Sequence, residues 1–352
     1  MTEASPLIPV YKMSVEFTKI FGNSHLKALF SNAVSDNKLP HAIILEGASG
    51  SGRYTFALNI AAAALCNGMA KPCYGCKNCR LIFEGVCPDV SLTGLAEGKA
   101  TIPVDAVREI RNDAQKVPVE GELKFYIIRD ADKMTVQAQN ALLKILEEPP
   151  SFVVFILISE NSNLLLSTIR SRASTFRMQR FDDSELAEYV VSYNPKAQAL
   201  KSSDEASFNR IIKAANGCIG SVLDNLDKRS LKCITDEYTM VTEMLTALCG
   251  SSKSDFMAFE DELPSKREEL RDSLITLRSA VRDILALKRG SSAEILFFEN
   301  ADDIKRISKT MTLSSVVEII DRIESTLNAN EQNANVNLLK INFMNSLWKC
   351  VH

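Results

Sequence analysis

The segment from residue 41 to residue 65 constrains the fold more than any other part of the chain, because it joins an apolar strand, a glycine-rich turn and a helix pattern. It reads HAIILE, then GASGSGRY, then TFALNIAAAAL. This is the order of elements in a phosphate-binding loop, where backbone N–H groups at the start of a helix meet phosphate oxygens. Gly47 and Gly52 match the two glycines of the pattern G-x-x-x-x-G-K-[ST]. The segment therefore predicts an α/β domain built around such a loop.

The two positions after Gly52 depart from this pattern. Arg53 stands where a lysine normally reaches the terminal phosphates, and its planar guanidinium is a poor substitute for a compact ammonium group. Tyr54 stands where a small hydroxyl normally ligates magnesium, and a phenol has the wrong reach. ATP binding by this chain is therefore expected to be absent or weak. In the plainest alternative, the loop is a glycine and serine turn that holds no ligand at all.

A second departure lies at the end of a neighbouring apolar run, KFYIIRDADKM. ATPases end this strand in an acidic pair that organises Mg²⁺ and polarises water, but here the pair is Arg129 and Asp130. A cation in the first position repels Mg²⁺, and aspartate is one methylene shorter than the usual glutamate. Because two separate parts of the site are changed, we expect no ATP hydrolysis by this chain. Asp130 and Asp132 could also be ordinary carboxylates at a strand end and a turn.

Four cysteines are crowded into a short segment directly after the loop helix. Cys66, Cys73, Cys76 and Cys79 follow the spacing C-x6-C-x2-C-x2-C, which is typical of a closed tetrahedral zinc site. Such a site leaves no open coordination position, so the zinc would be structural. Metal-free cysteines are the alternative. Cys87 could compete as a ligand, although we expect it to be a bystander.

Short apolar runs alternate with helix patterns up to about residue 180, which predicts a parallel sheet covered by helices. The expected strands are residues 41–46, 89–93, 124–129, 152–159 and 174–179. Beyond Phe181 only helix patterns follow. We expect three domains: an α/β core at residues 1–180 with the cysteine module at 66–79, a small helical domain at 181–228 and an all-helical domain at 229–352.

Charge and hydropathy exclude several classes of protein. The 352 residues carry 41 Lys and Arg against 44 Asp and Glu, and this net charge of -3 gives no global basic field that would hold a polyanion. No apolar run approaches the roughly 18 residues of a membrane span, and the first 14 residues lack the apolar core of a signal peptide. The chain is therefore expected to be cytoplasmic and without membrane contact. Any contact with nucleic acid must be local.

Several segments taken together resemble the AAA+ subunits of bacterial sliding-clamp loaders. They are LPHAIILEG before the loop, the four-cysteine insert after its helix, NALLKILEEPP, and STIRSRASTFRMQRF. Within this family the chain is most similar to the delta-prime type of DNA polymerase III subunit, because the motor subunits carry an intact phosphate loop and an Asp-Glu pair. The resemblance implies an AAA+ core with a five-stranded parallel sheet and a zinc insert, a small helical lid domain, and an all-helical C-terminal collar through which subunits assemble.

The resemblance also implies a functional residue. Arg172, in STIRSRA, matches the arginine that the family supplies in trans to ATP on a neighbouring motor subunit. Arg170 is its nearest competitor, and a solvated arginine without such a role is the plain alternative. Motor subunits place a sensing arginine in the lid, where this chain offers only Ile219 and Gly220.

The function implied by the resemblance is that of a stator-like subunit that does not hydrolyse ATP. Its expected partners are the gamma or tau motor subunits and the delta subunit, with the sliding clamp and primer–template DNA reached through the assembled complex. Two alternatives stay open. One is an ATP-hydrolysing motor subunit in which Arg53 and Asp130 replace the missing groups. The other is a zinc-dependent nucleic-acid-binding protein outside any loader.

Overall fold

A computed structural model describes residues 14–96, 98–226, 228–290, 295, 297–298, 301–332 and 334–352. The chain divides into two compact units. The first unit extends to Tyr189 and includes the short segment Gly217–Ser221, and the second comprises Val190–Asn216 and Val222–His352. The expected domain limits at residues 180 and 228 stay predictions, and residues 1–13 of the first expected domain lie outside the described residues.

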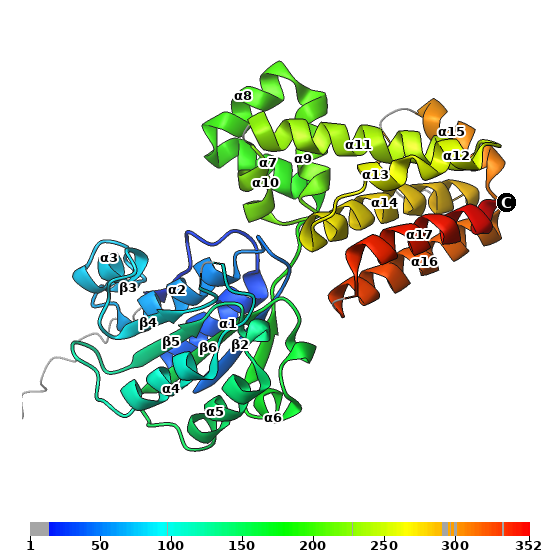
Figure 1. The fold of residues 1–352 in the computed structure, drawn as a ribbon. Helices are drawn as coiled ribbons and strands as arrows, with labels where there is room; N and C mark the ends of the chain where they lie inside the picture. Colours follow the sequence, from blue (N-terminus) through cyan, green and yellow to red (C-terminus); the bar gives the residue numbers. More distant parts are fainter. Residues whose placement is uncertain are drawn as a thin grey trace, which may run out of the picture. The chain divides into compact units, whose positions relative to one another are not determined.

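The first unit is built on a five-stranded parallel sheet (Figure 1). In chain order its strands are β2 (Ala42–Glu46), β4 (Val90–Thr93), β5 (Lys124–Ile128), β6 (Val153–Ser159) and β7 (Ser174–Arg177). Their order across the sheet is β4-β5-β6-β2-β7. The predicted α/β core with five parallel strands is thereby confirmed, and the bounds of β7 differ most from expectation, because the strand ends two residues early.

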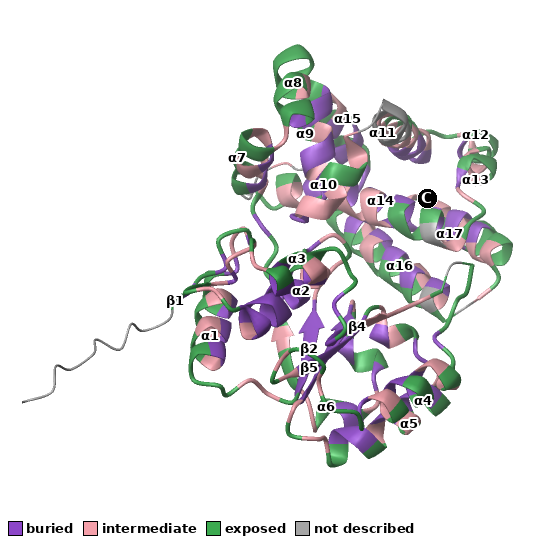
Figure 2. Ribbon diagram, turned by 90° about the vertical axis from the view of Figure 1, so that its left-hand side faces the viewer, coloured by how far each residue is buried: buried purple, intermediate pink, exposed green. Residues whose placement is uncertain are grey.

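The central strand β6 is apolar up to its last residue, Ser159, and its position in the sheet explains this. All seven of its residues are buried, and Ile156 pairs with Ile43 of β2 on one side and Ile127 of β5 on the other. Helices cover both faces of such a sheet, so no side chain of the strand needs to be polar. Figure 2 shows the buried strands between the helices.

The two faces of the sheet have separate hydrophobic cores. One core joins the sheet to α1 (Ser24–Ser35), α2 (Arg53–Leu65) and α3 (Lys77–Phe83). The other joins it to α4 (Val104–Asp113) and α5 (Val136–Glu147). Helix α2 is apolar around most of its circumference, as its alanine-rich sequence predicts for a helix enclosed in a core. Its buried body fixes its first turn at the end of β2.

Two short parallel strands, β1 (Ser14–Val15) and β3 (Ala70–Lys71), form a pair that the sequence did not predict. Each has only two residues, too few to show an alternating pattern. β3 lies inside the four-cysteine segment, so this pairing ties that segment to the start of the described chain.

The chain after Phe181 is helical among the described residues, as predicted. In order its helices are α7 (Asp183–Tyr193), α8 (Pro195–Ser203), α9 (Glu205–Ala214), α10 (Ile219–Asn225), α11 (Lys228–Leu248), α12 (Lys253–Met257), α13 (Phe259–Glu262), α14 (Arg267–Lys288), α15 (Ala301–Thr310), α16 (Leu313–Glu331) and α17 (Val336–Val351). The second unit has its own core, to which α11, α14, α16 and α17 all contribute. Among the described helices, none combines the length and the apolar character needed to span a bilayer.

Candidate functional site

The glycine-rich loop connects β2 to α2, the position that its sequence predicts. Gly47 follows the last residue of β2, and its N–H donates a hydrogen bond to the carbonyl of Ser159 at the end of β6 (3.2 Å). Gly52 is the N-cap of α2 with a φ of 84°, a left-handed conformation that favours glycine. The N–H of Ser51 donates to the carbonyl of Ala48 (3.2 Å). Two N–H groups of the loop are thus already used inside the protein.

The segment Gly217–Ser221, at the start of α10, covers the loop at Gly50. The N–H of Gly220 donates to the carbonyl of Gly50 at 2.9 Å. A Cβ atom on Gly220 would lie 2.8 Å from the Cα of Gly50, and one on Gly50 would lie 2.6 Å from the hydroxyl oxygen of Ser221. Only glycine at both positions permits this contact between backbones. From sequence, Gly220 indicated only that a lid arginine is missing, and its isolated position in a helix pattern was the one available signal.

The residues that replace the phosphate-binding lysine and the magnesium-binding hydroxyl both have partners inside the protein. A guanidinium nitrogen of Arg53 lies 3.7 Å from a carboxylate oxygen of Glu160, and the Arg53 side chain is only 10% exposed. The guanidinium of Arg129 lies over the ring of Tyr54, 5.4 Å from its centre. Arg129, at the position of the acidic residue that normally organises Mg²⁺, therefore contacts the ring of Tyr54, at the position of the hydroxyl that normally binds it.

The acidic residues after β5 are Asp130 and Asp132, and they lie at the same end of the sheet as two arginines. Asp130 has a φ of 51° and precedes a 3₁₀ turn at Ala131–Lys133. Burial raises the pKa of the Asp132 carboxyl, and the charge of Glu160 raises it further. Magnesium requires oxygen ligands around a site of negative charge. Arg53 and Arg129 instead bring two positive charges to this end of the sheet.

The four cysteines lie together, as their spacing predicts. The sulfur atoms of Cys66, Cys73, Cys76 and Cys79 are all within 4.8 Å of one another, and those of Cys66 and Cys76 are 3.9 Å apart. Four sulfurs bound to one zinc ion at about 2.3 Å would be separated by about 3.8 Å. The donor set therefore fits a zinc ion closed off by protein ligands. Cys87 is buried and is not one of the four.

Backbone N–H groups point at these sulfurs. The N–H groups of Gly68 and Cys73 donate to the sulfur of Cys66 at 3.3 and 3.4 Å. Hydrogen bonds from the N–H groups of Gly75 and Cys76 lower the pKa of the Cys73 thiol to about 6, whereas burial raises the pKa of Cys79. Because the thiolate is the metal-binding form, donors aimed at sulfur favour a metal-bound state.

The cysteine module is fixed to the loop helix by side-chain hydrogen bonds. The Asn78 amide donates to the carbonyl of Leu65 at 2.9 Å, and the Tyr74 hydroxyl donates to the side-chain oxygen of Asn59 at 2.8 Å. Asn59 and Leu65 both belong to α2. An ion held by the cysteines would thus stabilise the segment that follows the loop helix.

Arg172 lies just beyond the short helix α6 (Ser167–Arg170), with 36% of its side chain exposed. One guanidinium nitrogen is 3.0 Å from a carboxylate oxygen of Glu147, and the other donates to the carbonyl of Thr168 at 3.0 Å. Arg170 instead donates to the side-chain oxygen of Asn163 at 2.9 Å. The partners of Arg172 thus come from α5 and α6 and not from the glycine-rich loop.

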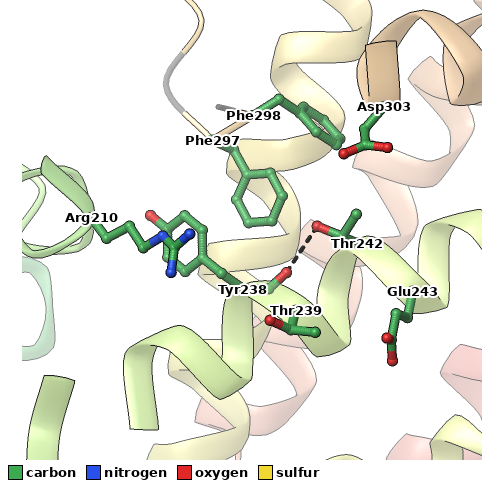
Figure 3. A pocket seen from close by; sticks show the side chains of 8 residues that line it. All are labelled: Arg210, Tyr238, Thr239, Thr242, Glu243, Phe297, Phe298 and Asp303. Atoms are coloured by element: carbon green, nitrogen blue, oxygen red, sulfur yellow. Dashed lines mark hydrogen bonds between the residues drawn. The ribbon is translucent and has the colours of Figure 1, made fainter. Parts of the chain in front are cut away.

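The second unit contains a pocket that the sequence did not predict (Figure 3). Its lining residues come from α9, α11, α15 and the segment between α14 and α15: Arg210, Tyr238, Thr239, Thr242, Glu243, Phe297, Phe298 and Asp303. The rings of Tyr238 and Phe297 are stacked, with centres 4.6 Å apart, and the Thr242 hydroxyl donates to the carbonyl of Tyr238 at 2.9 Å. No cysteine or histidine lines it, so its chemistry differs from that of the sites above.

Comparison with known proteins finds a family model and several relatives that resemble this chain. A family model described as DNA polymerase III, delta subunit matches residues 22–182. DNA polymerase III subunit delta' of Bacillus subtilis (strain 168) is 27% identical over 322 residues, which cover 88% of this chain and 91% of that protein. DNA polymerase III subunit gamma of Buchnera aphidicola subsp. Acyrthosiphon pisum (strain APS) is 30% identical over 245 residues, 66% of each chain. The match to subunit tau/gamma of Haemophilus influenzae is 30% identical but spans only 30% of that protein.

A solved structure of a gamma subunit-related protein from Thermotoga maritima covers 94% of this chain and 99% of its own, at 18% identity and a TM-score of 0.44. That superposition is too loose to support a conclusion about function. The residues that the family model matches, 22–182, include the glycine-rich loop, the four cysteines and Arg172. Residues 22–182 therefore match the DNA polymerase III delta subunit family, and the chain is similar to delta' over most of its length.

Proposed function

We propose that this chain is a stator-like subunit of a DNA polymerase III clamp loader that does not hydrolyse ATP. The observation that carries this proposal is the internal pairing at the glycine-rich loop. Arg53 pairs with Glu160, Tyr54 contacts Arg129, and Gly50 is hydrogen bonded to the start of α10. A nucleotide and its metal ion would have to displace these contacts.

The second part of the proposal is that Arg172 acts in trans on ATP bound to a neighbouring motor subunit. An arginine in this role stabilises charge on the transferred phosphoryl group and in related systems raises the rate on the order of 10³-fold or more. Arg172 is partly exposed and lies away from the glycine-rich loop of its own chain, which suits action on another chain. The family relationship supports the assignment.

The proposed partners follow from the same relationship. They are the gamma or tau motor subunits and the delta subunit, which are joined through a helical collar at residues 229–352, beyond a lid at 181–228 and the AAA+ core at 1–180. The sliding clamp and primer–template DNA are reached through the assembled complex, in the cytoplasm. A net charge of -3 is consistent with only a minor share of the phosphate contacts.

Zinc completes the proposed subunit as a structural ion. It would be held by Cys66, Cys73, Cys76 and Cys79. Its role would be to hold together the segment that follows α2. The four thiols, enclosed by their own backbone N–H groups, leave no position for a reacting water. The ion is therefore assigned no part in hydrolysis.

The test is a reconstituted loader that contains this chain with the motor and delta subunits of its own organism. ATP turnover stimulated by clamp and primed DNA is measured with wild type, Arg172→Ala and the matched control Arg170→Ala. We expect all three to assemble, and only Arg172→Ala to slow hydrolysis at the adjoining site. Normal assembly with unchanged turnover for Arg172→Ala would remove the trans role.

The match to gamma subunits at 30% identity favours one rival, an ATP-hydrolysing motor subunit. In that case Arg53 and Asp130 would have to act in place of the missing lysine and acidic pair. Turnover by the isolated chain that is abolished by Arg53→Ala would establish this rival. We expect no turnover by either form.

A further inference from the structure

We infer that Glu147 positions Arg172 for its action on the neighbouring subunit. This inference rests on the function proposed above, and it adds a residue of the segment NALLKILEEPP to which the sequence assigned no role of its own. Glu147 is the last residue of α5, and one of its carboxylate oxygens lies 3.0 Å from a terminal nitrogen of Arg172.

The guanidinium is held from two sides by two different elements. Glu147 of α5 contacts one terminal nitrogen, while the other terminal nitrogen donates to the Thr168 carbonyl at 3.0 Å and to the Ser171 hydroxyl at 3.3 Å. A guanidinium carries five N–H donors. The hydrogen bonds to Thr168 and Ser171 use two of these donors from one terminal nitrogen, and the Glu147 contact is an ion pair, so N–H groups remain for an incoming phosphoryl group.

Helix α5 holds the backbone of Glu147 in a fixed position. The Thr135 hydroxyl caps the first turn by accepting the N–H of Ala138 at 3.2 Å, and Leu142 and Leu146 are buried in the core beneath the sheet. The Glu147 carboxylate therefore extends from a fixed helix, whereas Arg172 lies on a turn. A long arginine side chain has many rotamers, and a contact with a fixed carboxylate reduces them.

The pair is too exposed to matter much for folding. The Arg172 and Glu147 side chains are 36% and 51% exposed, and ion pairs at such positions contribute little to stability. The loss of Glu147 should therefore appear in the geometry of Arg172 and not in the fold. An effect of this kind lowers kcat and leaves the KM for ATP of the motor subunit unchanged, because Arg172 acts mainly in the transition state.

The test uses the reconstituted loader with ATP, clamp and primed DNA, and compares wild type, Glu147→Ala, Glu147→Gln and the control Glu148→Ala. Glu148 is the adjacent exposed carboxylate, and it makes no recorded ion pair among the described residues. We expect Glu147→Ala to lower kcat about two- to fivefold at unchanged KM, since this is the range that an exposed pair can supply. Glu147→Gln keeps an acceptor oxygen and should lose less. Glu148→Ala should match wild type.

A double-mutant cycle separates positioning from a general structural role. In a loader that already contains Arg172→Ala, adding Glu147→Ala should cause no further loss, because its effect passes through the arginine. An equal loss in both backgrounds, or wild-type kcat for Glu147→Ala, would overturn the inference. If Arg172→Ala slows hydrolysis while Glu147→Ala does not, only this inference falls. If Arg172→Ala itself has no effect, the proposed function falls with it.

Discussion

Arg53 and Tyr54 occupy the two positions of the loop whose side chains normally contact the nucleotide phosphates and Mg²⁺. Each has a partner from elsewhere in the first unit: Glu160, just after β6, for Arg53, and Arg129, just after β5, for Tyr54. Both side chains of the loop are thus paired within the first unit. Single substitutions toward the ATPase pattern would break these contacts without creating a complete site.

A half-buried ion pair between Lys124, at the start of β5, and Asp113 gives a prediction with a definite pH dependence. Lys124 is almost fully buried and lies 2.7 Å from Asp113, and this hydrogen bond lowers the pKa of the Asp113 carboxyl from 3.8 to about 2. A folded-state pKa below the unfolded value means that the stabilisation is present above about pH 4 and is lost as the pH falls toward 2. Asp113→Asn should therefore unfold more easily at pH 7.

The expected loss for Asp113→Asn is about 1 kcal/mol, less than the pKa shift alone implies, because the Asp113 side chain is 41% exposed and partly screened by solvent. Urea unfolding at pH 7 and at acid pH measures it. The difference from wild type should shrink between about pH 4 and pH 2. A difference that stays constant over this range would show that the carboxylate charge is not its source. Asp105→Asn, in an exposed pair with Arg108, is the matched control.

Among the elements, the start of α10 and the cysteine module determine what surrounds the loop. The first covers the loop at Gly50, and the second is joined to α2 through Asn59 and Leu65. The first contact requires glycine where the two backbones meet, and the second requires polar side chains that can form the hydrogen bonds. Each can therefore be tested with one substitution.

Gly220→Ala should loosen the contact between α10 and the loop. The new Cβ would lie 2.8 Å from the Cα of Gly50, which is backbone and cannot rotate away. We expect a net loss of about 1 to 2 kcal/mol, since overpacking costs somewhat more than alanine gains over glycine in a helix. Amide exchange at residues 47–52 should also accelerate. Unchanged stability and exchange would contradict the contact, and Asp224→Ala, exposed on the same helix, is the control.

Removal of zinc should affect the cysteine module locally. We expect about one zinc ion per purified chain, to be lost in Cys76→Ser and retained in Cys87→Ala. Amide exchange should then rise in residues 66–83, while β5 and β6 stay protected, because the sheet has its own core. A chain that purifies without metal and keeps this segment protected would contradict a zinc site.

The five strands of the main sheet, the loop and the cysteine cluster could be predicted because each depends on residues close together in the sequence. The apolar run at residues 152–159 indicated a strand, and the spacing of Cys66, Cys73, Cys76 and Cys79 indicated a shared site. The contact of Gly220 with Gly50 could not be predicted, because it joins residues far apart and leaves no periodic pattern. The partners of Arg53 and Arg172 depend likewise on which elements the fold brings together.

At the scale of the whole molecule, the near balance of positive and negative charges limits how tightly the isolated chain can bind DNA. With a net charge of -3, it should bind DNA weakly outside a loader. We expect the isolated chain to bind primed DNA with a Kd weaker than about 10⁻⁴ M at physiological salt, at or beyond the weak end of non-specific binding. Tight binding with a steep salt dependence, measured by fluorescence anisotropy, would favour an independent nucleic-acid-binding protein instead.

The most direct measurement is single-turnover ATP hydrolysis by the reconstituted loader, with wild type or Arg172→Ala in place of this chain. Assembly of both forms is verified first. We expect the isolated chain to show no hydrolysis, and the Arg172→Ala loader to lose at least about tenfold of the rate at the adjoining site, well within what a trans arginine can supply. An intact Arg172→Ala loader that hydrolyses ATP at the wild-type rate would contradict the central claim.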